Sequence, residues 1–219
     1  LGTRGDPTAL KSVSRYLGSN DLSIRRAAVK TVNKLGGPSE VKSLLAAADK
    51  QEMSDSVTRA IVGMDGARID AALVDALASN NLRNPAIKAS IARGNTAAVP
   101  ALIKLTRDRD AEVRKDAWAG LGALADDDDV DAMMDIILKI DDTADLGSAE
   151  GAMRNIFARA KDRDKCFEAV ASRYDRASDA VKVSILDLSA AIGNSEALKL
   201  QRSALKSGNK KLATAALRS

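Results

Sequence analysis

Residues 110–125, DAEVRKDAWAGLGALA, carry apolar side chains at helical intervals. Val113, Ala117 and Leu121 follow one another every four residues, and Leu124 continues the series. At about 100° per residue these positions fall on one side of a helix. The segment therefore predicts an amphipathic helix with one apolar stripe that needs a neighbour to cover it.

The same pattern occurs 89 residues earlier, in residues 21–36, DLSIRRAAVKTVNKLG, where Ile24, Ala28 and Val32 take the place of the first three apolar positions. Weaker copies recur at intervals of 25 to 35 residues. A period near thirty is typical of stacked helical hairpins. The predicted first residues of these further copies are Ser54, Ser79, Asp145, Ser178 and Asn209.

Other apolar stripes lie between these helices, as at Val99, Leu102 and Ile103, so the repeating unit is predicted to be helix A, turn, helix B. Pro100 suits the start of a helix A, and Asp21 and Asp110 are natural N-caps for helix B. Glycines that follow the stripes are expected to close helix B in the left-handed conformation. They are Gly36, Gly94 and Gly193.

Pro85 departs from the repeat, because it would lie well inside a helix B that began at Ser79. A proline inside a helix costs about 3 kcal/mol. We therefore expect this helix to begin late, near Pro85, and to be short.

Composition agrees with closely packed helices. Hydrophobic residues make up 45% of the 219 residues and aromatic residues 2%, so Ala, Leu, Val and Ile must build the core. Four prolines and the lack of strand-like alternation favour an all-α fold. The single cysteine excludes an intrachain disulfide, and no apolar run is long enough to predict a membrane span.

The sequence resembles HEAT-repeat proteins of the short-period bacterial type, a group that includes repeats related to phycobilisome lyases. Such a resemblance implies a right-handed α-α superhelix of about six to seven two-helix repeats, forming a single domain over residues 1–219. It also implies that the B helices line a concave surface, which usually binds other proteins. The residues that carry the resemblance are Val99, Pro100, Leu102, Asp110, Val113, Arg114, Ala117, Leu121 and Leu124.

Both ends of the sequence fall inside the repeat pattern, because Leu1-Gly2 matches Leu35-Gly36 and the chain stops at Ser219 within another helix B. We therefore expect a fragment of a longer protein, with flanking domains in the same parent chain. The compartment is left open.

The sequence contains few residues that could catalyse a reaction or bind a metal or phosphate. The chain has no histidine, which excludes imidazole bases, Ser-His-Asp triads and His-ligated metals. Cys166 is expected to be a packed thiol, and the acidic run 126–129 is expected to solvate a turn and favour a helix N-terminus rather than hold a cation. No Gly-rich phosphate loop follows a strand. We predict no catalytic residue, no cofactor and no metal, and hence no enzyme.

A basic residue recurs just outside the apolar stripe. By resemblance to HEAT proteins, this position is expected to form a ladder that ties neighbouring repeats through turn carboxylates. Trp118 lies on the flank of its helix and is either an inter-repeat plug or a partly exposed anchor for a partner. The ladder residues are Arg25, Arg83, Arg114 and Lys182.

A second basic row lies opposite the stripe, at the positions that match Lys115 and Ala119, with Glu150 and Asp187 as interruptions. Such a row would attract an acidic peptide, an acidic protein surface or a phosphate backbone. The alternative is an ordinary solvated helix face. With Trp118, the predicted partner-binding residues are Arg26, Lys30, Arg59, Lys88, Lys115 and Arg154; Arg218 ends the row.

Net charge is +4 but uneven, at +5 over residues 1–100, −6 over 101–160 and +5 over 161–219. The leading hypothesis is a non-catalytic scaffold that binds a protein or peptide on the B-helix face. Nucleic-acid binding is an alternative, although aromatic residues are too few for base stacking and the middle of the chain is acidic. An accessory role for an enzyme, such as a chromophore lyase, rests on the resemblance alone.

Overall fold

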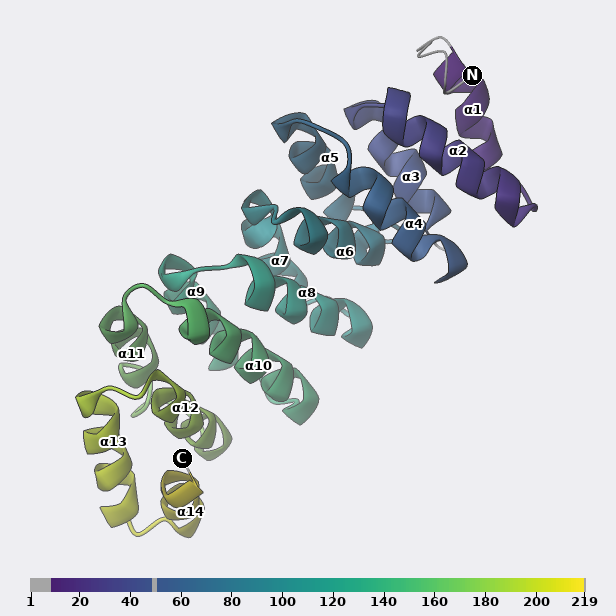
Figure 1. Cartoon of the computed structure of the whole chain (residues 1–219). Coiled ribbons are helices and arrows are strands. Elements are labelled where there is room, and N and C mark those ends of the chain that lie inside the picture. Colours follow the sequence, from purple (N-terminus) through teal and green to yellow (C-terminus); the bar gives the residue numbers. More distant parts are fainter. Residues whose placement is uncertain (1–8, 49–50, 219) are drawn as a thin grey trace. The chain divides into compact units, whose positions relative to one another are not determined.

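A computed structural model describes residues 9–48 and 51–218, and these residues form helices and turns with no strand (Figure 1). The all-α prediction is confirmed. The chain divides into two compact units, residues 1–104 and 105–219, which are described separately. The prediction of one domain over 1–219 stays a prediction. No helix among the described residues is long and apolar enough to span a membrane.

Unit 1 is built from antiparallel helix pairs. Its B helices α2, α4 and α6 pack in sequence, and α3 packs between the segment Arg15–Gly18 and α5 on the A side. Short 3-10 turns precede two of the A helices, at Pro38–Glu40 and Thr96–Ala98. The helices are α1 (Leu10–Ser14), α2 (Leu22–Leu35), α3 (Val41–Ala47), α4 (Gln51–Val62), α5 (Ala67–Leu77) and α6 (Arg83–Arg93), and α7 (Val99–Leu105) contains the boundary between the units.

Unit 2 repeats this plan. The B helices α8, α10, α12 and α14 pack in sequence, and the A helices α9, α11 and α13 do the same. A 3-10 turn at Asp127–Asp129 leads into α9. The helices are α8 (Ala111–Leu124), α9 (Val130–Ile137), α10 (Thr143–Arg159), α11 (Arg163–Ala171), α12 (Asp179–Ile192), α13 (Ser195–Lys206) and α14 (Lys210–Arg218).

The cores of both units consist mainly of aliphatic side chains, as the composition predicts. The stripe residues Val32, Leu44 and Leu73 of unit 1 have exposed fractions of 0%, and so do Leu121 and Met133 of unit 2. Each helix buries its stripe against the next helix, which is the main stabilising contribution in a stack of this kind.

The predicted N-caps are confirmed in α2 and α8. The Asp21 carboxylate accepts the backbone N–H groups of Ser23 and Ile24, and Asp110 accepts that of Glu112. These bonds satisfy backbone donors that have no partner within the helix.

Two predicted helix starts are wrong. Ser54 lies inside α4, which already begins at Gln51, and Asp145 lies in the first turn of α10, whose N-cap is Asp142. The Asp142 carboxylate accepts the N–H groups of Ala144 and Asp145, and these bonds lower its pKa. As a result, α10 has 17 residues whereas α2 and α8 have 14.

The late start predicted at Pro85 is confirmed. Helix α6 begins at Arg83, so Pro85 lies in the first turn, where its missing N–H breaks no helical bond, and the helix has 11 residues. Gly94 and Gly193 close their helices at φ values of 66° and 71°, as predicted. The prediction for Gly36 is wrong, because its φ is −83°; a Cβ there would lie 2.6 Å from the Val32 oxygen.

Candidate partner-binding groove

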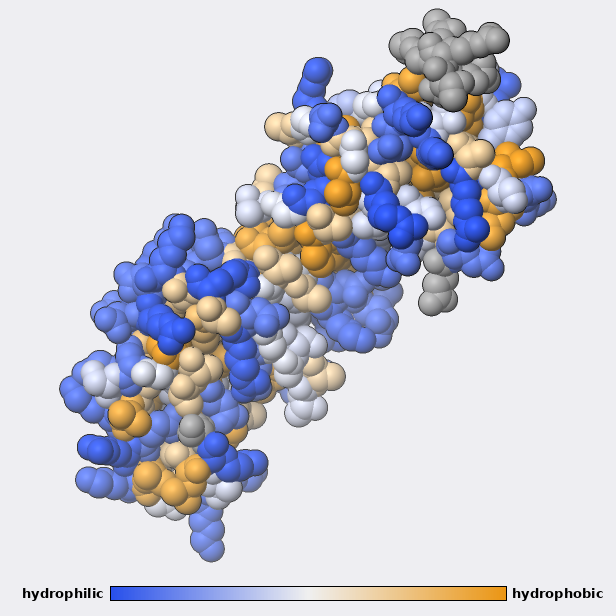
Figure 2. Space-filling model, viewed as in Figure 1, coloured by the Kyte–Doolittle hydropathy of each residue, from blue (hydrophilic) through white to orange (hydrophobic). Residues whose placement is uncertain are grey.

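A groove with a volume of about 330 Å³ runs between the B helices α2 and α4 of unit 1. We call it the α2–α4 groove. On the face seen in Figure 2, strongly hydrophilic side chains gather over these two helices. The groove is lined by Arg26, Val29, Lys30, Asn33, Ser56, Arg59 and Ala60.

The helix geometry explains how the groove forms. Arg26 and Lys30 are four residues apart and therefore lie on one face of α2, while Arg59 projects from α4. Val29 is buried, so the groove has an apolar component beneath its charged rim. The Asn33 side-chain amide donates to the carbonyl of Ala60, at 2.5 Å, and joins the two helices at one end of the groove.

The charged side chains that line the groove are all cations. Among the residues that the structure describes, no carboxylate lies within ion-pair distance of Arg26, Lys30 or Arg59. All three cations are exposed. A groove lined by one sign of charge raises the local concentration of oppositely charged ligands.

The remaining basic candidates are not gathered into this groove. Lys88 is exposed on α6 and is absent from the groove lining. In unit 2, Lys115 lies 3.8 Å from Glu112 and Arg154 lies 3.6 Å from Glu150. These carboxylates offset the basic character of α8 and α10.

The basic ladder is present for Arg25 and Arg114. Each donates to the carbonyl six residues earlier, in its own A–B turn: Arg25 to Ser19 at 2.6 Å and Arg114 to Asp108 at 3.0 Å. Each also meets a carboxylate on the next B helix, at 3.9 Å for Glu52 and 2.6 Å for Asp145. The contacts across repeats therefore use helix carboxylates rather than the predicted turn carboxylates.

The other two ladder positions behave differently from each other. Arg83 Nε donates to the Leu77 carbonyl at 3.2 Å, which again is six residues earlier. Lys182 instead places its ammonium 5.6 Å from the centroid of the Tyr174 ring, a cation–π distance.

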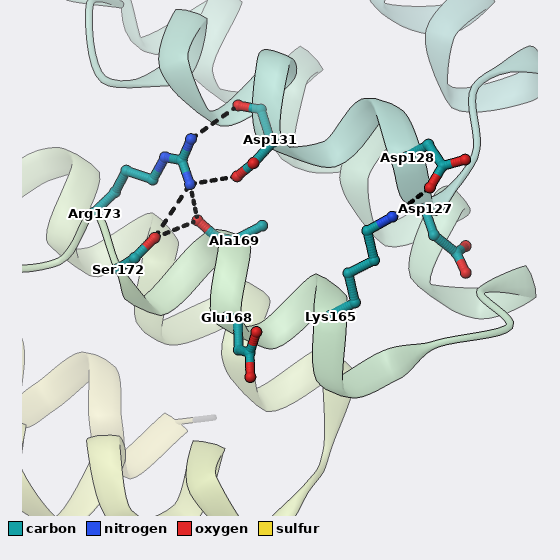
Figure 3. Close-up of a pocket in the computed structure, with 8 residues that line it drawn as sticks. All are labelled: Asp127, Asp128, Asp131, Lys165, Glu168, Ala169, Ser172 and Arg173. Atoms are coloured by element: carbon teal, nitrogen blue, oxygen red, sulfur yellow. Dashed lines mark hydrogen bonds and ion pairs between the residues drawn. The ribbon is translucent and has the colours of Figure 1, made fainter.

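A second pocket, of about 570 Å³, lies on the A side of unit 2 (Figure 3). Its charges are paired across repeats. Arg173, two residues after the end of α11, bonds to Asp131 at 2.5 Å and to Asp135 at 3.0 Å, and Lys165 pairs with Asp128. The ion pair with Lys165 lowers the pKa of Asp128. These contacts fasten α11 to the preceding repeat, whereas Glu168 points away from both cations in Figure 3.

The acidic run 126–129 serves the turn, as predicted. The Asp126 carboxylate accepts the N–H of Asp128, and the Asp129 carboxylate accepts the N–H of Asp126. Asp127 accepts the N–H groups of Lys161 and Asp162 in the next repeat. No group of three or more potential metal ligands occurs in the described part of the chain.

Comparison with known proteins identifies the repeat. Residues 71–154 match the family model of HEAT repeats. Residues 71–154 therefore consist of HEAT repeats. No curated protein matches the sequence.

Solved structures with similar architecture include designed and natural proteins. A designed armadillo repeat protein is 18% identical, with 95% of this chain and 97% of that chain covered and a TM-score of 0.42. Another, in complex with the peptide (KR)4, is 18% identical, with 95% and 96% covered and a TM-score of 0.39. Human deoxyhypusine hydroxylase in complex with glycerol is 16% identical, with 100% and 96% covered and a TM-score of 0.42.

Within the HEAT repeats, the structure distinguishes the two alternatives for Trp118. Its side chain has an exposed fraction of 0%, which agrees with the plug and not with an exposed anchor. The buried indole N–H has no hydrogen-bond partner among the described residues. Trp118 is therefore removed from the candidate binding surface.

Cys166 is also part of the packing between helices. It is buried in α11, and burial raises the pKa of its thiol to about 11. Since the thiolate is the nucleophilic form, this pKa agrees with the predicted packed thiol.

Sequence reasoning missed Val29, Asn33 and Ser56 as groove residues. Val29 and Asn33 lie one turn apart on α2, but only the pairing of α2 with α4 makes them neighbours of Ser56. The carboxylates beside Lys115 and Arg154 could have been recognised, because Glu112 and Glu150 stand three and four residues earlier in the same helices.

Proposed function

We propose that this protein is a non-catalytic scaffold whose α2–α4 groove binds an acidic peptide segment of a partner protein. The observation that carries the proposal is the convergence of Arg26, Lys30 and Arg59 on one groove. HEAT repeats commonly present extended surfaces for protein binding, so the repeat architecture is compatible with this role.

The groove favours a peptide with both acidic and aliphatic residues. Guanidinium groups bind carboxylates in a two-pronged geometry, and the Lys30 ammonium adds a more flexible donor. Val29 and Ala60 offer apolar surface between these charges. A peptide that alternates Glu and Leu matches this combination.

The lining of the groove offers little for catalysis. Its polar groups besides the three cations are the Asn33 amide, which already bonds to Ala60, and the Ser56 hydroxyl. A nucleophilic serine needs an adjacent base, and the lining contains neither a histidine nor a carboxylate. These features support a binding role.

The test is fluorescence anisotropy of a labelled peptide of alternating Glu and Leu titrated with the full chain. The double variant Arg26→Ala/Arg59→Ala should weaken binding at least about tenfold, or about 1.4 kcal/mol. Salt should weaken wild-type binding, because the attraction is between exposed charges. Unchanged affinity in the double variant would rule out this groove as the docking site.

A matched control removes two other cations of unit 1. Lys34 and Lys42 are exposed but do not line the groove, so Lys34→Ala/Lys42→Ala changes the net charge equally and should leave affinity within about twofold. If both double variants weaken binding alike, the attraction is non-specific.

Duplex DNA serves as the competing ligand in the same assay. No residue that lines the groove is aromatic, so base stacking cannot add to phosphate contacts there. We expect the peptide to bind more tightly than duplex DNA at the same salt concentration. The reverse order would favour the nucleic-acid alternative.

A further inference from the structure

The α2–α4 groove holds its polar side chains in two pairs, one on each helix. Arg26 and Lys30 are one turn apart on α2, and Ser56 and Arg59 are one turn apart on α4. Residues one turn apart on a helix have Cβ atoms about 5–6 Å apart, and packed helices lie about 8–10 Å apart. Arginine and lysine side chains are long enough to cross half of that distance. The two helices can therefore direct three cations and a hydroxyl group at one bound group.

The groove is too short for a long run of acidic residues. Its lining extends over residues 26–33 of α2 and 56–60 of α4. At about 1.5 Å per residue, these segments are about 10 Å and about 6 Å long. On one side of an extended peptide, successive side chains are about 7 Å apart. The groove therefore accepts one or two side chains of a peptide, and three cations act on them.

The nearest carboxylates on α4 leave these cations available. Glu52 lies 3.9 Å from Arg25 and does not line the groove. Asp55 is exposed four residues before Arg59, but it also lies outside the lining and forms no ion pair within the described part of the chain. The half-buried Ser56 hydroxyl has no hydrogen-bond partner among the described residues and can donate to a ligand.

We propose that the anionic residue bound by the groove is a phosphoserine or phosphothreonine of the partner peptide, an inference that rests on the proposed function. A phosphate monoester carries about −1.5 to −2 charges at pH 7 and three strong acceptor oxygens. A carboxylate carries one charge and only two oxygens. One phosphoryl group therefore engages all three cations and the Ser56 hydroxyl, with two-pronged contacts from Arg26 and Arg59 and a single contact from Lys30.

The test compares three labelled peptides by anisotropy with the full chain. The first is the peptide of alternating Glu and Leu, the second has phosphoserine in place of its central Glu, and the third has serine there. The phosphopeptide should bind at least about tenfold more tightly than the Glu-Leu peptide, and the serine peptide should bind most weakly.

Two substitutions separate recognition of phosphate from attraction of charge. Arg59→Lys keeps the charge but loses the two-pronged contact, and it should weaken binding of the phosphopeptide at least about threefold. Ser56→Ala should weaken it about three- to tenfold but change binding of the Glu-Leu peptide by less than about twofold, because a carboxylate has no third oxygen for the hydroxyl. Ser54→Ala is the matched control, since Ser54 is a half-buried serine of α4 outside the groove.

The pH dependence gives an independent measurement. The second pKa of a phosphate monoester is about 6, so affinity for the phosphopeptide should rise at least about threefold between pH 5 and pH 7.5. Glutamate, with a pKa of about 4.3, is already mostly ionised at pH 5, so affinity for the Glu-Leu peptide should change less than about twofold. The chain has no histidine, so no imidazole of the protein contributes to the difference.

The outcomes distinguish this inference from the proposed function. Equal affinity for the phosphopeptide and the Glu-Leu peptide would overturn the inference and leave the acidic-peptide groove standing. Binding of the phosphopeptide alone would support the inference, whereas binding of neither peptide would overturn both. Tighter binding of duplex DNA than of the phosphopeptide at the same salt concentration would assign the phosphate contacts to nucleic acid, and the inference would be wrong.

Discussion

Arg114 and Lys115 are neighbours in α8 whose ion pairs lie in opposite environments. The Arg114 side chain is 20% exposed and its partner Asp145 is 17% exposed, whereas Lys115 and Glu112 are 65% and 70% exposed. A carboxylate that loses its cation inside a protein is costly, but a solvated pair contributes little. Arg114 therefore forms a largely buried, structural ion pair, whereas the ion pair of Lys115 is solvated at the surface.

Arg114→Met should lower the free energy of unfolding by about 2 kcal/mol, since Asp145 would stay largely buried without its cation. Lys115→Met should change it by less than about 0.5 kcal/mol. Urea unfolding followed by the emission of Trp118, the single tryptophan, measures both. Equal effects of the two substitutions would show that the ladder pair has no special role.

At the scale of the element, close contact between α8 and α10 depends on a glycine. A Cβ at Gly122 would lie 3.0 Å from the Ala152 Cα and 3.3 Å from the Asn155 side-chain nitrogen. A Cβ at Gly151 of α10, by contrast, would meet no atom within 4 Å. The two glycines are both helical but differ in the space beside them.

Gly122→Ala should lower the free energy of unfolding by about 1–2 kcal/mol, because it forces α8 away from α10. Gly151→Ala should raise it by about 0.5–1 kcal/mol, because alanine favours the helix and nothing obstructs it. Thermal and urea unfolding of both variants check the opposite signs. A stabilising Gly122→Ala would contradict the close packing of these helices.

The elements show what the sequence could and could not predict. Apolar spacing predicts α2 and α8 correctly, and their N-caps with them. In both helices a capping residue, Asp21 or Asp110, stands directly before the segment that carries the apolar stripe. In α10 the sequence offers Asp142 and Asp145 three residues apart, and both can cap a helix. The path of the preceding turn decides between them, and that path depends on tertiary packing.

The α2–α4 groove is likewise only partly predictable from the sequence. Exposure of Arg26, Lys30 and Arg59 follows from their position opposite or beside an apolar stripe. The prediction for Arg59 rests on a repeat start that is wrong, yet Arg59 reaches the groove because α4 packs on α2. The three cations share one groove because α2 packs against α4. The apolar pattern of a single helix does not reveal this pairing.

At the scale of the whole molecule, the stability of HEAT repeats is expected to be distributed rather than global. Each helix pair buries its stripe mainly against its neighbours, as the sequential packing of α2, α4 and α6 illustrates. In such arrays the stability approximates a sum of repeat and nearest-neighbour contributions, and long arrays lose two-state behaviour. The two compact units should therefore respond separately to local damage.

Leu73→Ala tests this independence, because Leu73 is fully buried in α5 of unit 1 and its truncation should cost about 2–5 kcal/mol. Circular dichroism, which reports on all helices, should then show an earlier transition, while Trp118 emission in unit 2 keeps its wild-type midpoint. Met133→Ala, an equally buried change in unit 2, should shift the Trp118 midpoint. If Leu73→Ala shifts that midpoint as far as Met133→Ala does, the chain unfolds as one cooperative block.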